Sequence, residues 1–155
     1  MNRSVEHPSF TFRLERVRSL RESAEEQARE ELARELSHRL RGEALLRQAT
    51  HAVSAAREAG RDKVVGGASA ADLMAAQVWM ERAERHRLDA AADLHRLDGE
   101  VERSRAALAE AAREREVIER LKRKQQADHQ AEALRLAQIQ LDEIALTVHR
   151  RGTAA

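Results

Sequence analysis

The sequence predicts an all-α fold in which two long helices pair as an antiparallel coiled-coil hairpin, the second helix being longer and carrying a C-terminal overhang. The composition supports this, because charged residues make up 35% and aromatic residues only 2% of the chain. Such a composition is typical of long paired helices rather than of a compact enzyme. One glycine-rich break separates two stretches of helical periodicity. We therefore expect residues 1–155 to form a single elongated domain.

The first helix is expected over about residues 11–58. Pro8 disfavours helix in the residue before it, and Ser9 or Thr11 can cap the helix that follows. Apolar residues then recur at steps of three and four, which is the helical period. These positions are Leu14, Val17, Leu20, Ala24, Ala28, Leu32, Leu36, Leu40, Leu45 or Leu46, Ala49 and Val53.

The turn is expected over residues 59–69. Gly60, Gly66 and Gly67 lie within this segment, and glycine supplies the backbone conformations that a turn requires. Ser69 is followed three residues later by Asp72, which fits the capping box that opens a helix. We therefore place the start of the second helix directly after Ser69.

The second helix is expected over about residues 70–149. A three-four ladder of mainly apolar residues runs along it, and it turns wholly polar between Lys122 and Glu132. Folding back about the turn brings the start of the first helix opposite roughly residues 115–118, so about thirty residues are left as an overhang. An unpaired apolar stripe predicts a partner protein. The large apolar residues of the overhang are Leu121, Leu134, Leu136, Ile139, Leu141, Ile144 and Leu146.

The charge balance and the residue types exclude several classes of function. The chain has 28 basic and 27 acidic residues, whereas a dedicated nucleic-acid binder needs a surface of one sign. The absence of cysteine excludes disulfides, thiolate nucleophiles and cysteine-bound zinc. The sequence has no apolar run long enough to span a membrane, and its first twelve residues lack the apolar core of a secretory signal. A cytoplasmic protein is expected.

No feature of the sequence predicts catalysis. It lacks the phosphate-binding, zinc-protease and nucleophile-elbow motifs, and two paired helices offer no concave pocket for a reacting group. His86 and His95 open similar tetrads, but nine residues turn them to opposite helix faces, so they cannot share a metal ion. We expect no enzyme activity, no catalytic residue, no cofactor, no metal and no small-molecule substrate.

Two surface features have open interpretations. Residues 120–124 are basic, but Glu116 and Glu119 each precede an arginine by four residues, which favours an ion-paired helix face over a patch for an acidic partner. Trp79 lies beside the ladder and either folds onto the turn or contacts a partner. We expect Leu45 and Leu46 at the same level as Trp79, where they could form one apolar patch with it.

Three segments resemble the FliJ family of flagellar export proteins. Residues 10–21 read Phe-Thr-Phe-Arg-Leu-Glu-Arg-Val-Arg-Ser-Leu-Arg, which is similar to the opening of that family. Residues 113–124 and the run Leu-Asp-Glu-Ile-Ala at 141–145 resemble its C-terminal half. The related stalk proteins of virulence-type secretion share this architecture, so both systems stay open.

The resemblance implies a non-enzymatic central stalk of an export apparatus. Its partners would be a hexameric export ATPase, a membrane export-gate protein and substrate chaperones, and it would lie in the cytoplasm at the inner face of the cell membrane. The residues that the resemblance places against the ATPase are Phe12, Leu14, Val17, Leu20, Leu136, Ile139, Leu141, Asp142, Glu143 and Ile144. Those that it places against the gate are Leu45, Leu46, Trp79 and His86.

Two alternatives belong to other classes. The chain could lie on a membrane surface as an amphipathic helix, but its apolar stripes are narrow, rich in alanine and flanked by mixed charge. It could also be a generic coiled-coil scaffold that dimerises through its overhangs. We prefer the export stalk.

Overall fold

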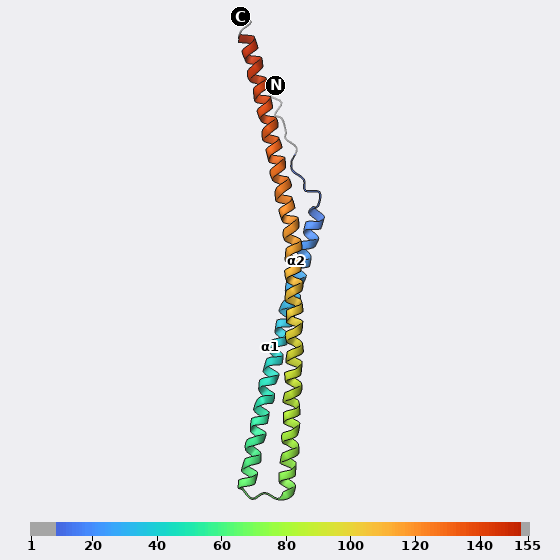
Figure 1. Ribbon diagram of the computed structural model, residues 1–155, viewed down its shortest axis with the longest axis vertical. Helices are drawn as coiled ribbons and strands as arrows, with labels where there is room; N and C mark the ends of the chain where they lie inside the picture. The colour runs from blue at the N-terminus through green and yellow to red at the C-terminus, as the bar shows by residue number, and fades with distance from the viewer. Residues whose placement is uncertain (1–8, 153–155) are drawn as a thin grey trace. The chain divides into compact units, whose positions relative to one another are not determined.

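The computed structural model describes residues 9–152 and contains two helices. Helix α1 spans Glu15–Val65 and helix α2 spans Ala70–Gly152. The two helices run antiparallel, and residues 66–69 join them (Figure 1). No β-strand occurs in residues 9–152. The predicted all-α fold with two long antiparallel helices is confirmed.

The chain divides into two compact units, and each unit contains part of both helices. Unit 1 consists of Met1–Ala24 and Ala112–Ala155, and unit 2 is Glu25–Ala111. Unit 2 therefore holds the turn and the helical segments on either side of it. Unit 1 holds the start of α1 and the C-terminal part of α2. That residues 1–155 form one elongated domain stays a prediction.

Both ends of α1 differ from the sequence prediction. The helix begins at Glu15 instead of residue 11, after a short non-helical segment in which the Glu15 N–H donates to the Phe12 carbonyl at 3.2 Å. It ends at Val65 instead of residue 58, so Gly60 lies inside the helix and not in the turn. The predicted turn of residues 59–69 thus shortens to residues 66–69.

A Schellman motif ends α1. Gly67 has a φ of +70°, a left-handed conformation that glycine adopts without strain. The Gly67 N–H donates to the Val64 carbonyl at 3.3 Å, and the Ala68 N–H donates to the Lys63 carbonyl at 3.0 Å. These two bonds satisfy carbonyls that the end of the helix would leave unpaired. The glycine pair at 66–67 therefore sets the end of α1, and the isolated Gly60 does not.

The predicted capping box opens α2. The Asp72 N–H donates to Ser69 Oγ at 3.2 Å, and the Ser69 N–H donates to Asp72 Oδ2 at 3.3 Å. The Ser69 hydroxyl also donates to Asp72 Oδ2 at 2.6 Å, and this bond is the largest of the contacts that lower the pKa of Asp72. Because the contacts are local, the sequence pattern was sufficient to place the start of this helix. At the other end, α2 continues to Gly152, slightly beyond the expected residue 149.

A narrow line of small side chains holds the helices of unit 2 together. We call the contact line between α1 and α2 the seam. Met80 packs against a buried cluster of Val53, Ala56 and Ala83. The ladder predicted on α2 begins at Leu73, which is 37% exposed, but it is correct from Ala76 to Lys122, where each position is buried or half-buried. These positions are Ala76, Met80, Ala83, Arg87, Ala90, Leu94, Leu97, Val101, Ser104, Leu108, Ala111, Arg115, Ile118 and Lys122. The buried apolar residues of the seam are Ala49, Val53, Ala56, Ala76, Ala83 and Val101.

On α1 the predicted core positions are partly wrong. Leu20 and Leu40 are 69% and 60% exposed, whereas Glu25 is 5% exposed and Gly42 is buried. The seven-residue repeat that contains the buried Ala49 passes through Gly42, not Leu40. In unit 2 an ion pair also joins the two helices, because Arg39 Nε on α1 donates to Asp98 on α2 at 2.6 Å. The three-four spacing therefore chose the wrong residue at Leu20 and Leu40, whereas Leu32, Leu36 and Leu46 are half-buried as predicted.

The glycines of unit 2 give a test of this packing. A Cβ built on Gly60 or Gly99 meets no atom within 4 Å, whereas a Cβ on Gly42 would lie 2.8 Å from Leu97 Cδ1. We expect Gly60→Ala and Gly99→Ala each to raise the free energy of unfolding by about 0.5–1 kcal/mol, because alanine favours helix. Gly42→Ala should gain less or lose stability, since Leu97 must move.

Urea unfolding followed by circular dichroism measures all of these variants. An increase for Gly42→Ala that equals or exceeds the increase for Gly60→Ala would contradict the close approach of the helices at Gly42.

Candidate protein-binding surfaces

A non-helical N-terminal segment extends the contact with α2 in unit 1. Phe12 is 5% exposed, and Lys122 Nζ lies 5.9 Å from the centre of its ring. The Phe10 ring lies 5.7 Å from the His129 ring, at an interplanar angle of 47°. The prediction that α2 loses its partner after about residues 115–118 is therefore wrong, because side chains before α1 reach His129.

Ion pairs join the start of α1 to α2 in unit 1. Glu15 accepts hydrogen bonds from Arg18 at 2.7 Å and Lys122 at 3.1 Å, and Arg18 also donates to Glu119 at 3.1 Å. Arg18 and then Lys122 hold the pKa of Glu15 below its usual value, and Glu15 and Glu119 raise the pKa of Arg18. Because the ladder on α2 is polar here, charge pairing and Phe12 replace the apolar contacts of the seam.

The basic cluster at residues 120–124 is largely paired. Arg120 donates to Glu116 at 3.0 Å, as predicted. Arg123 also donates to Glu116 at 3.0 Å instead of to the expected Glu119, because Glu119 pairs with Arg18. The hydrogen bond from Arg120 is the main cause of the lowered pKa of Glu116. An ion-paired helix face is thus the better description of this cluster.

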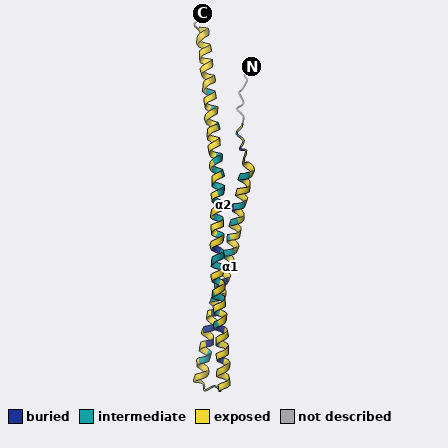
Figure 2. Cartoon of the chain, turned by 45° about the vertical axis from the view of Figure 1, so that its right-hand side comes forward, coloured by how far each residue is buried: buried dark blue, intermediate teal, exposed yellow. Residues whose placement is uncertain are grey.

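Because Phe10 contacts His129, we use the term overhang from here on for residues 130–152 of α2 only. These residues expose most of their apolar side chains (Figure 2). Leu134 is 72% exposed and Leu141 is 66% exposed, although leucine normally avoids water. An exposed apolar surface of this kind marks a contact site for another molecule. The exposed large apolar residues of the overhang are Leu134, Leu136, Ile139, Leu141, Ile144, Leu146 and Val148.

The apolar residues of the overhang form two stripes. At about 100° per residue, Leu136, Ile139 and Leu146 fall on one side of the helix. They continue the line of the seam. The second stripe lies on roughly the opposite side and consists of Leu134, Ala137, Leu141, Ile144 and Val148. The overhang can therefore contact surfaces on two sides at once.

A family comparison covers nearly the whole chain. The model of the family described as "FliJ: Flagellar FliJ protein" matches residues 10–154. The chain belongs to the FliJ family. Membership assigns it to the flagellum and to flagellar protein export. No curated protein and no solved structure matches the chain.

The residues that the FliJ resemblance placed against the ATPase differ in accessibility. Phe12 is buried within unit 1 and Val17 is half-buried, so both support the fold of this unit. Leu14 is partly accessible, with 37% of its surface exposed. The remaining residues of the set are exposed: Leu20, Leu136, Ile139, Leu141, Asp142, Glu143 and Ile144. Their binding role stays a prediction.

The residues expected at the export gate do not form one patch. Leu45 and His86 line one groove of about 410 Å³ between the helices of unit 2, whereas Leu46 lines another groove with Leu94. Trp79 is 49% exposed beside Met80 and lines neither groove. The prediction that Leu45 and Trp79 lie opposite each other on the two helices is wrong. Because α1 continues to Val65, the turn lies further along the chain than predicted, and Leu45 is further from the turn than Trp79 is.

A groove beside the turn was missed by the sequence analysis. Its floor consists of small residues, and Gly60 had been assigned to the turn and not to a helix face. The spacing of Ala56 and Gly60 by four residues is the sequence signal that could have revealed it, once the Gly66–Gly67 pair is recognised as the helix end.

The described part of the chain shows neither a metal-binding cluster nor a membrane-spanning stretch. Within residues 9–152, no group of three or more histidine, aspartate and glutamate side chains is arranged to hold a metal ion. Neither α1 nor α2 contains a stretch that is long and apolar enough to cross a membrane.

The lowered carboxyl pKa values predict acid sensitivity. The pKa values of Glu15, Glu84, Glu100, Glu116 and Glu132 are lowered mainly by hydrogen bonds from arginine. Because these pKa values are lower in the folded chain, the stabilisation is complete above about pH 4.3, the ordinary glutamate value, and is lost as the pH falls through the lowered values. We expect a constant melting temperature from about pH 5 to 7 and a lower one near pH 3.

Circular dichroism melting curves at each pH provide this measurement. A melting temperature at about pH 3 equal to the neutral one would show that the ion pairs add no stability.

Proposed function

We propose that this FliJ-family chain is a non-enzymatic stalk of the flagellar export apparatus that binds a hexameric export ATPase through its overhang. The exposure of the overhang's apolar residues is the observation that carries this proposal. Leu141 and Ile144 belong to one stripe and Ile139 to the other, and burial against the ring would remove all of them from water. Family membership supports the export role.

The two stripes suit a helix that is enclosed on more than one side. A helix inserted at the centre of a ring meets neighbouring subunits on opposite faces, so both stripes would be buried together. A stalk that binds different conformations of the ring with unequal affinity shifts the populations of those conformations. The chain would then influence ATP turnover without contributing a catalytic residue.

We further propose that unit 2 contacts a membrane export-gate protein and substrate chaperones. Leu45 and His86 share a groove, and Trp79 offers a half-exposed aromatic ring of the kind that is enriched in interface hot spots. This role would place the protein in the cytoplasm, peripherally at the inner face of the cell membrane. A pull-down of the gate's cytoplasmic part with Leu45→Ala and His86→Ala variants addresses this contact separately.

The ATPase contact has a direct test in the full-length chain. A double variant, Leu141→Glu with Ile144→Glu, places charges in the apolar stripe that contains Leu134. We expect it to stimulate the export ATPase at least about ten-fold less than the unmodified chain, because two exposed apolar anchors become charged. Stimulation is measured as phosphate release at a fixed ATPase concentration.

A matched control adds the same charges outside the stripes. Gln140 and Thr147 lie on one side of the overhang between the stripes, and both are exposed. Gln140→Glu with Thr147→Glu should therefore retain most of the stimulation. Equal stimulation by the stripe variant and by the unmodified chain would remove the overhang from the mechanism.

A further inference from the structure

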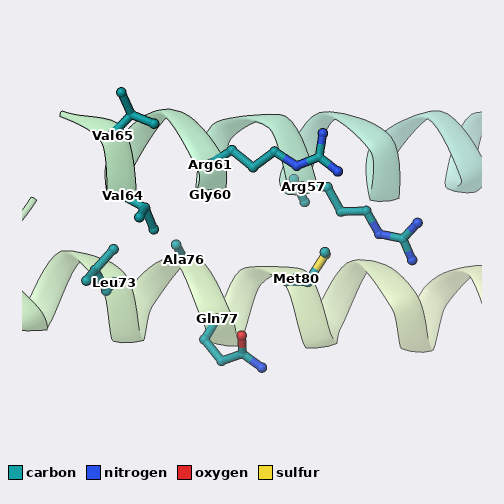
Figure 3. Close-up of a pocket in the computed structure, with 10 residues that line it drawn as sticks. Arg57, Gly60, Arg61, Val64, Val65, Leu73, Ala76, Gln77 and Met80 are labelled. Carbon is teal, nitrogen blue, oxygen red and sulfur yellow. The ribbon is translucent and has the colours of Figure 1, made fainter. Parts of the chain in front are cut away.

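The groove beside the turn in unit 2 lies between α1 and α2 and has a volume of about 790 Å³ (Figure 3). Ala56, Gly60 and Ala76 leave space between the helices because their side chains are small or absent. Val64, Leu73 and Met80 point into this space from the two helices. The interior of the groove is therefore apolar, although it opens to solvent.

One lining side chain of the groove is itself largely exposed. Val65 lines the groove from α1 and is 88% exposed. Figure 3 shows Val65 pointing away from α2, so it adds apolar surface at the edge of the groove. An apolar surface of this kind beside a turn matches the groove that a protein uses to bind the apolar face of an amphipathic helix.

Two arginines give the groove a positive charge. Arg57 and Arg61 line it from α1, four residues apart, and no acidic residue lines it. Many other arginines of the described residues form ion pairs, but no such pair includes Arg57 or Arg61. Arg57 still lies close enough to Glu84 to add weakly to the lowering of its pKa, which is caused mainly by Arg87. Arg61 is thus the clearest available partner for a carboxylate.

We propose that this groove binds an amphipathic helix of a partner protein that carries acidic residues beside its apolar stripe. Val64, Leu73 and Met80 would contact the apolar stripe, and Arg57 and Arg61 would pair with carboxylates that are spaced by one helical turn. The site lies in unit 2 and does not involve the overhang. It goes beyond the proposed function, because it depends on neither the ATPase nor the identity of the gate.

A labelled synthetic peptide of roughly eighteen residues serves as the probe. It carries leucines at helical spacing on one face and two glutamates, four residues apart, beside them. Fluorescence anisotropy should show saturable binding to the full-length chain. A second peptide with lysines in place of the glutamates should bind at least about ten-fold more weakly.

Variants of the chain locate the binding site. Gly60→Leu adds an apolar side chain at the floor of the groove, where a Cβ meets no atom within 4 Å. It should weaken binding of the acidic peptide at least about ten-fold while helicity is kept. Gly99→Leu is the matched control outside the groove and should bind as the unmodified chain does. Arg61→Glu should reverse the preference, so that the lysine peptide binds more tightly.

Two results would overturn the proposal. One is absence of binding of the acidic peptide, or binding that Gly60→Leu and Arg61→Glu leave unchanged. The other is a chain that forms dimers in sedimentation equilibrium and becomes monomeric on Gly60→Leu, because the occupant would then be a second copy of the chain. Neither result depends on an export ATPase, so the proposed stalk function would be unaffected by either.

Discussion

The narrow seam between two antiparallel helices is the constraint on which the rest of the structure depends. A long helix is stable in water only when one of its faces packs against a partner, and here most of the buried apolar residues are alanine or valine. Such small side chains bring the helices close together but bury little surface. The chain therefore supplements the seam with the Arg39–Asp98 pair in unit 2 and the Glu15–Arg18–Glu119 network in unit 1.

The same constraint explains why both candidate surfaces exist. In unit 1 the partner of α2 ends with Phe10 against His129, and the apolar residues that follow remain exposed. In unit 2 a glycine and two alanines form the floor of an open groove. A chain that buries so little of its own apolar surface leaves that surface accessible to other molecules, which agrees with membership of a flagellar export family.

Local signals could be predicted from the sequence, whereas contacts between distant residues could not. The Ser69–Asp72 cap and the ladder on α2 follow from short spacings; the cap was correct, and the ladder was correct from Ala76 to Lys122. The end of α1 was missed because a single glycine is tolerated within a helix, while the glycine pair with a left-handed residue ends it. The contact between the Lys122 ammonium group and the Phe12 ring joins residues far apart in the sequence, so no local pattern reveals it. The groove beside the turn was missed for a related reason. Its lining comes from both α1 and α2, so it can be located only when the register between the two helices is known.

Hydrogen exchange of the full-length chain, with and without the cognate export ATPase, measures directly whether the ATPase covers the overhang. We expect amides of residues 131–149 to exchange quickly in the free chain and to become protected in the complex, whereas residues 49–56 in the buried seam should change little. Unchanged exchange of residues 131–149 in the complex, or full protection of these residues in the free chain, would contradict this expectation.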